Sequence, residues 1–175
     1  MAASDLGALG GARGLNMGMQ MASLLVSEAA EKHVTVGTAE SLTGGLVAGT
    51  ITAVSGASEV LLGGIVSYAV SVKHAVLGVD QEVLDTVGPV SEECARQMAE
   101  GARRVIGCDM AVAVTGIAGP GGAEQGKPVG TVWFGLATPD WTSAEKQLFD
   151  GDRESVREQT VSHAIKLLRE GLRDF

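Results

Sequence analysis

The stretch TAESLTGG, residues 38–45, combines residue types that could perform nucleophilic chemistry at a turn. It lies between the apolar-rich run 33–37 and an apolar run that starts at Leu46, a pattern that predicts a strand, a sharp turn and the start of a helix. A serine in such a turn can point its hydroxyl away from the sheet, close to N–H groups that could hold an anion or a developing oxyanion. The alternative is that Ser41 or Thr43 only caps the helix.

A nucleophilic serine also needs a base, and the segment SYAVSVK, residues 67–73, offers one. A strand that ends near Tyr68 would place the phenol at the carboxyl edge of a sheet, and Lys73 follows one helical turn later. Lysine acts as a base only if burial lowers its pKa far enough to leave part of it neutral. The alternative is a solvated surface lysine. The three histidines fall on helical or flanking positions typical of surface or packed residues.

A second glycine-rich run, TGIAGPGG at 115–122, is followed by GKPVGT at 126–131. A strand that leads into so many glycines presents backbone N–H groups without obstruction by Cβ atoms, which suits a phosphate or carboxylate ligand. The spacing matches neither a Walker loop nor a dinucleotide-binding fingerprint, and the run could also be a flexible connection. Together with the turn at 38–45 and the Tyr–Lys segment, it predicts a ligand cleft at one edge of an α/β sheet.

Periodicity predicts the elements that position these residues. Strands are expected at 34–38, 64–68, 110–115, 129–137 and 146–149, and helices at 17–32, about 44–54, 69–77, 81–86, 91–106 and from Asp152 onward. Ser91 should cap its helix, with Glu92 and Glu93 in the first turn. The alternation predicts an α/β layered domain with a mixed, mostly parallel β-sheet flanked by helices, in which the last two strands form a hairpin. We expect one domain over 17–175 after a disordered extension over 1–16.

Composition narrows the classes of function. The chain has 175 residues, 45% of them hydrophobic, and a net charge of −8, which argues against nucleic-acid binding. No segment offers about 20 uninterrupted apolar residues for a membrane span. Cys94 and Cys108 match no metal-ligand spacing and imply no disulfide framework, and the first 20 residues lack the pattern of a signal peptide. We therefore expect a cytoplasmic protein with no bound metal, no nucleic-acid partner and no membrane partner.

The motifs TAESLTGG, VSYAVSVK, GPVSEE, VAVTGIAGPGG, KPVGTVWFGLAT and FDGDRESVREQTV follow one another in an order that resembles the CinA carboxy-terminal domain. This is the family of bacterial nicotinamide mononucleotide amidohydrolases, and the resemblance covers about residues 17–173. It implies hydrolysis of nicotinamide mononucleotide to nicotinate mononucleotide and ammonia by a Ser/Lys mechanism, without metal or cofactor. Carried over by position, Ser41 is the nucleophile, Lys73 the general base and Tyr68 an aid to proton transfer, while N–H groups near Thr43 and Gly44 hold the oxyanion.

The substrate-binding residues expected on the same basis are Glu40, Thr43, Gly44, Gly45, Thr115, Gly116, Gly119, Gly121, Gly122 and Lys127. The 5′-phosphate should be held by the region 119–122 or by Lys127. The chain departs from the family pattern at Leu42 and Val70, where members often carry Cys and a polar residue. We expect a homo-oligomer that acts on a small nucleotide. Two alternatives stay open: a non-catalytic nucleotide-binding module, and an amidase or esterase for another small substrate.

Overall fold

The computed structural model describes residues 4–175 of the chain, with side chains from residue 17 onward. Its centre is a five-stranded sheet of order β2-β1-β3-β4-β5. The strands are β1 (Val36–Glu40), β2 (Leu61–Val66), β3 (Met110–Gly116), β4 (Thr131–Ala137) and β5 (Thr142–Leu148). β1 pairs in parallel with β2 and β3, whereas β4 is antiparallel to both β3 and β5. All strands except β4 therefore run in one direction, which confirms the mixed, mostly parallel sheet.

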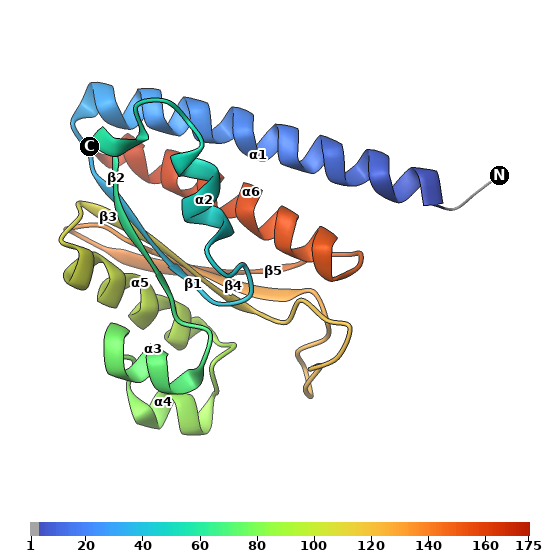
Figure 1. Ribbon diagram of the computed structural model, residues 1–175. Helices are drawn as coiled ribbons and strands as arrows, with labels where there is room; N and C mark the ends of the chain where they lie inside the picture. The colour runs from blue at the N-terminus through green and yellow to red at the C-terminus, as the bar shows by residue number, and fades with distance from the viewer. Residues whose placement is uncertain (1–3) are drawn as a thin grey trace.

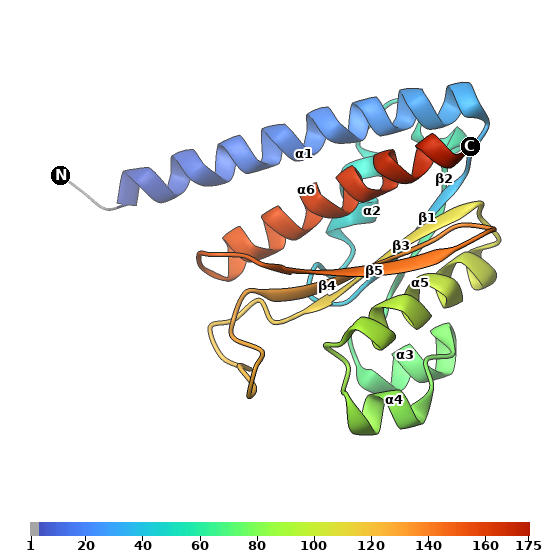
Figure 2. The ribbon, with the colours of Figure 1, turned by 180° about the vertical axis from the view of Figure 1, so that it is seen from behind.

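Helices cover both faces of this sheet (Figures 1 and 2). One face carries α1 (Ser4–Lys32), α2 (Leu46–Thr52) and α6 (Arg153–Gly171), and the other carries α3 (Val70–Leu77), α4 (Gln81–Thr86) and α5 (Glu92–Ile106). Two hydrophobic clusters, one on each side of the sheet, form the core. The α/β layered fold expected from the sequence is thus confirmed. Two short 3₁₀ turns, Ala57–Glu59 and Leu172–Asp174, complete the secondary structure of the described part.

Glycines allow α5 to lie close to its neighbours. A Cβ atom at Gly135 of β4 would come within 2.1 Å of the Ala95 carbonyl oxygen, and one at Gly101 of α5 within 2.0 Å of the Leu77 carbonyl oxygen. Backbone atoms cannot yield as flexible side chains do, so any side chain at these positions would force the layers apart. α5 is therefore packed closely against the sheet and against α3, the helix that carries Lys73.

Several local predictions are confirmed and others are corrected. The Ser91 hydroxyl caps α5 by accepting a hydrogen bond from the Cys94 N–H, and β4 and β5 form the expected hairpin. β2 ends at Val66, two residues before Tyr68, and begins at Leu61 rather than at Gly64. The backbone of α1 is traced from Ser4, but residues 1–3 and the side chains of 1–16 lie outside the described residues, so the disordered extension stays a prediction. None of the described helices is long and apolar enough to cross a membrane.

Candidate active site

The turn after β1 is organised by the carboxylate of Glu40, which is 1% exposed. One oxygen accepts hydrogen bonds from the Thr43 hydroxyl at 2.6 Å and from the N–H groups of Gly45 and Val47 at 3.0 Å. The other oxygen accepts from the Ala48 N–H and the Thr38 hydroxyl. A buried carboxylate surrounded by donors at the start of a helix is strongly stabilised. Glu40, Thr43 and Gly45 therefore hold the turn together, and none of the three lines the pocket beside Ser41.

The same hydrogen bonds decide which N–H groups of the turn could hold an oxyanion. The Gly44 N–H, one of the expected oxyanion donors, donates instead to the Ser41 carbonyl oxygen at 3.1 Å in this structure. Gly44 and Gly45 adopt φ angles of 63° and 101°, a backbone region that favours glycine. Within the described part of the chain, the N–H groups of Leu42 and Thr43 donate no hydrogen bond. These two N–H groups are thus the ones left for an anion beside Ser41.

A pocket of about 220 Å³ opens beside Ser41 at the carboxyl ends of β1, β2 and β3. Its walls bring together the expected residues Ser41, Tyr68, Lys73, Thr115 and Gly116. Parallel strands end at the same edge of a sheet, so three segments that are distant in sequence meet there. Ser41 is half-buried, and Tyr68 is 64% exposed at the rim. The predicted cleft is therefore present, with the proposed nucleophile, base and hydroxyl in its walls.

Lys73 is the most unusual residue of the pocket, because its side chain is buried to 1% exposure. Its Nζ donates to the Ser67 carbonyl oxygen at 2.6 Å, and no carboxylate among residues 17–175 forms an ion pair with it. Burial lowers the pKa of Lys73 to about 8, opposed in part by the charge that Cys94 would carry as a thiolate. Burial also raises the pKa of Cys94 to about 11, so this thiol is neutral at neutral pH. A sizeable fraction of Lys73 is therefore neutral in mildly alkaline solution.

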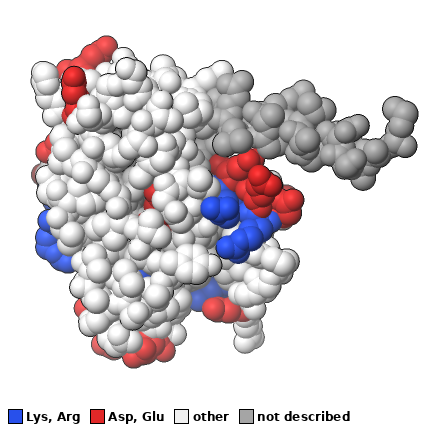
Figure 3. Space-filling model, viewed as in Figure 1, with Lys and Arg blue, Asp and Glu red and all other residues white. Residues whose placement is uncertain are grey.

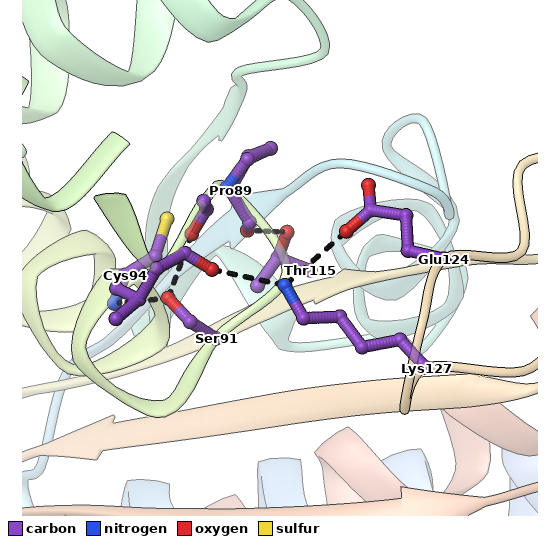
Figure 4. Close-up of polar contacts among 8 residues, drawn as sticks. Pro89, Ser91, Cys94, Thr115, Glu124 and Lys127 are labelled. Atoms are coloured by element: carbon purple, nitrogen blue, oxygen red, sulfur yellow. Dashed lines mark hydrogen bonds and ion pairs between the residues drawn. The ribbon is translucent and has the colours of Figure 1, made fainter. Parts of the chain in front are cut away.

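The glycine-rich loop after β3 takes a different place from the one expected. Gly121 and Gly122 are exposed, Gly119 is buried, and none of the three lines the pocket. Lys127 donates to the Val87 carbonyl oxygen at 2.9 Å and lies 3.3 Å from the Glu124 carboxylate. Figure 4 shows this lysine directed toward the segment before α5, close to the hydrogen bond between Thr115 and Pro89. Lys127 therefore joins two loops and does not line the pocket beside Ser41, so the structure does not bring it together with the other expected site residues.

Two arginines of α6 were missed by the sequence reasoning. Arg153 lines the pocket, and its Nη1 donates to the Gly119 carbonyl oxygen at 2.9 Å. Arg157 donates from Nε to the Leu42 carbonyl oxygen at 3.0 Å and from Nη2 to the Thr43 carbonyl oxygen at 3.1 Å. Figure 3 shows basic and acidic side chains together over the start of α6, on a face that is otherwise mostly uncharged. The sequence signal for Arg153 and Arg157 was limited to two arginines four residues apart at the start of a helix.

The remaining wall of the pocket is apolar and includes Leu42, Val70, Val90 and Ala118. An apolar wall beside a few convergent polar groups is typical of a small-molecule pocket. Among the residues that the structure describes, no group of three or more His, Cys, Asp or Glu side chains could hold a metal ion. The chemistry available in the described pocket is therefore that of a serine hydroxyl, a buried amine, a phenol and a guanidinium.

A serine and a buried lysine thus line one pocket at the carboxyl ends of the parallel strands of a layered α/β sheet. The family model "CinA C-terminal domain" matches residues 18–172, and the chain belongs to this family. A CinA-like protein of Anaeromyxobacter sp. strain K is 47% identical over 154 residues, which are 88% of this chain and 38% of that protein. A putative competence-damage inducible protein of Moorella thermoacetica is 43% identical over 82% of this chain and 35% of its own length. The chain thus spans little more than a third of these relatives.

Solved structures resemble the fold closely. A CinA superfamily protein from Klebsiella pneumoniae 700603 superimposes with a TM-score of 0.87 at 32% identity, over 90% of this chain and 99% of that one. A competence/damage inducible protein from Agrobacterium tumefaciens gives a TM-score of 0.85 at 38% identity, over 88% and 94% of the two chains. Each of these structures therefore shares the fold of this chain over nearly its whole length.

Proposed function

We propose that this protein hydrolyses the carboxamide of nicotinamide mononucleotide, giving nicotinate mononucleotide and ammonia through a serine nucleophile and a lysine base. The observation that carries the proposal is the buried Lys73, whose pKa is lowered to about 8 in the same pocket as Ser41. A fully buried lysine with no carboxylate partner among residues 17–175 destabilises the fold at neutral pH. Such a cost is typical of a functional site, here one that uses the neutral amine. Membership of the CinA family supports the choice of substrate.

In the proposed reaction, the neutral Nζ of Lys73 removes the proton from the Ser41 hydroxyl as Oγ attacks the carboxamide carbon. The N–H groups of Leu42 and Thr43 are the available donors for the oxyanion. The tetrahedral intermediate collapses when its C–N bond breaks, and Lys73 returns the proton to the leaving ammonia. Water then attacks the ester on Ser41 and gives a proton to Lys73. The C–O bond to Oγ breaks, the proton returns to Ser41, and the carboxylic acid leaves.

Substrate binding would use both halves of the pocket. The apolar wall that contains Leu42 and Val90 suits the face of a pyridine ring, while Tyr68 at the rim can support proton transfer. For the 5′-phosphate we propose Arg153 in place of Lys127, since Arg153 is the arginine in the pocket wall and a guanidinium can bind phosphate through two donors.

Ammonia release from nicotinamide mononucleotide tests the proposal directly. Ser41→Ala should lower kcat by several orders of magnitude, whereas Ser143→Ala, a control on the exposed side of β5, should leave it unchanged. Both variants should unfold at the same urea concentration as the parent protein. No ammonia release by the parent, or near-normal kcat in Ser41→Ala, would contradict the proposed function.

The phosphate assignment needs a separate comparison of substrates and variants. Nicotinamide riboside and nicotinamide should be progressively poorer substrates than the mononucleotide, because a remote charged group helps to orient the reacting amide. Arg153→Met should reduce kcat/KM for the mononucleotide far more than for the riboside, while Lys127→Met should affect both equally. Equal values for riboside and mononucleotide in the parent protein would eliminate a phosphate anchor. A panel of other amides and esters would then identify a different substrate.

A further inference from the structure

Arg157 of α6 binds the backbone of the loop that carries Ser41. The guanidinium of Arg157 is partly buried and donates to two successive carbonyl groups, those of Leu42 at 3.0 Å and Thr43 at 3.1 Å. These contacts join residues more than a hundred positions apart in the sequence. A planar guanidinium with fixed donor directions can set the orientation of both peptide groups at once.

The orientation of these two peptides determines where their N–H groups point. In a trans peptide the carbonyl and the N–H point in opposite directions. With the Leu42 carbonyl directed at Arg157, the Thr43 N–H is turned to the opposite side, and it donates no hydrogen bond within the described residues. With the Thr43 carbonyl directed at Arg157, the Gly44 N–H is turned back to the Ser41 carbonyl oxygen at 3.1 Å. Arg157 thereby orients the peptides Leu42–Thr43 and Thr43–Gly44, which begin one residue after Ser41.

The same helix also holds the opposite side of the pocket. Arg153 lies four residues earlier and donates to the Gly119 carbonyl oxygen in the glycine-rich loop. Residues four apart lie on the same side of a helix, so the first two turns of α6 contact both loops that border the pocket. All three bonds go to main-chain carbonyls, which suits a support for loop geometry.

We propose that Arg157 is a positioning residue for Ser41, which keeps the serine loop and the Thr43 N–H in the arrangement that acylation requires. This inference rests on the proposed function for its chemical consequence, although the ordering of the loop can be measured without any substrate. The competing explanation is a general contribution to stability, of the kind made by Arg169. That residue, also on α6, binds the Glu28 carboxylate of α1 through Nε and Nη2 and does not line the pocket.

Arg169→Met is therefore a matched control for Arg157→Met, since each variant removes one guanidinium of α6 that makes a two-point contact. Arg157→Met should speed hydrogen exchange of the Gly44 and Gly45 N–H groups by about tenfold or more, while Arg169→Met leaves them unchanged. Arg157→Met should also slow labelling of Ser41 by a fluorophosphonate, and lower kcat by about 10- to 100-fold with little change in KM. The pH midpoint of activity should stay that of the parent, because Lys73 remains in place. Arg157→Lys should be intermediate in exchange and in labelling.

The outcomes separate this inference from the proposed function. If Arg157→Met leaves exchange at Gly44 and Gly45 unchanged, or if Arg169→Met slows labelling of Ser41 to the same extent, the positioning role is overturned. If the parent protein releases no ammonia from nicotinamide mononucleotide, yet Arg157→Met increases exchange locally and slows labelling of Ser41, the proposed substrate fails and the positioning role stands. Faster exchange at Gly44 and Gly45 in Arg157→Met with unchanged labelling of Ser41 would show that Arg157 orders the loop without an effect on the serine. That result would also overturn the proposal.

Discussion

Replacement of Lys73 by methionine should reveal the energetic cost of burying this lysine. Its pKa falls from 10.5 to about 8 on folding, because the charged form loses its hydration. Since each pKa unit is worth about 1.4 kcal/mol, this fall corresponds to about 3 kcal/mol of destabilisation below pH 8. Methionine has a similar length and no charge, so Lys73→Met removes this cost at low pH.

The sign of the pH dependence follows from the direction of the shift. Between pH 8 and 10.5 the unfolded chain binds a proton at Lys73 that the folded protein has released, so the free energy of unfolding of the parent rises with pH. The slope approaches about 1.4 kcal/mol per pH unit within this window. Lys73→Met lacks that slope. Its advantage over the parent should therefore shrink by about 3 kcal/mol as the pH rises from below 8 to above 10.5.

The absolute difference between the two proteins is less informative than its change with pH. The variant also loses the hydrogen bond from Nζ to the Ser67 carbonyl oxygen, and an unpaired buried carbonyl costs about 1–3 kcal/mol at any pH. This loss offsets much of the gain at neutral pH but adds no slope. Groups that do not interact with Lys73 titrate alike in both proteins and cancel in the difference. Cys94 does interact with Lys73, but its pKa is raised to about 11, so it contributes only at the upper end of the range.

Urea unfolding at intervals from pH 6.5 to 10.5 measures the difference, and urea is preferable to guanidinium because it leaves the ionic strength unchanged. Lys166→Met, which removes a half-exposed ammonium from α6, controls for the loss of one positive charge. If the difference between Lys73→Met and the parent stays constant across this range, burial does not lower the pKa of Lys73, and the argument for a neutral base fails.

Three further predictions concern the site and its scaffold. Lys73→Arg should be almost as inactive as Lys73→Ala, because a guanidinium keeps its proton. In the parent protein, kcat/KM should rise with pH through about 8. Rescue of activity by arginine would instead indicate that only a positive charge is needed at this position. Glu40→Gln should lower the free energy of unfolding by about 2–4 kcal/mol, because an amide NH₂ would face the donors that now bind the carboxylate. An unchanged midpoint of urea unfolding would contradict this prediction. Gly101→Ala should destabilise by about 1–3 kcal/mol through its clash with the Leu77 carbonyl, whereas Gly49→Ala, in open space on α2, should be neutral or stabilising.

The order of elements was predictable because each carries a local signal. The buried run of β3, the capped start of α5 and the hairpin of β4 and β5 depend on periodicity, capping and turn residues that lie close together in the sequence. The start of β2 was misplaced because Gly63 and Gly64 interrupt the apolar pattern of an edge strand. Local signals thus placed the carboxyl ends of the strands only approximately, but closely enough to predict the edge of the sheet at which the pocket lies.

The contacts that complete the site were not predictable, because they depend on packing between distant segments. Nothing near Lys73 in the sequence indicates that α5 covers α3 and buries the lysine. In the same way, the glycine-rich loop suggested an anchor for phosphate, yet Lys127 is bound to the Val87 carbonyl and Arg153 takes the place in the pocket wall. A sequence identifies residue types capable of chemistry, whereas the tertiary structure decides which of them face one another.

The turn at 38–45 shows why an acid can stand next to a proposed nucleophile without disabling the proposed base. A carboxylate that faced Lys73 would favour the ammonium and raise its pKa, which would leave less neutral amine to accept the serine proton. Glu40 instead points into the start of α2, where the Thr43 hydroxyl and three N–H groups bind it. The pKa of Lys73 is accordingly governed by burial, with a smaller opposing effect of Cys94, and Glu40 is not among the charges that act on it. The two glycines supply the backbone angles that let the chain fold around this carboxylate, so the turn uses its acid to build the loop and leaves Ser41 facing the pocket.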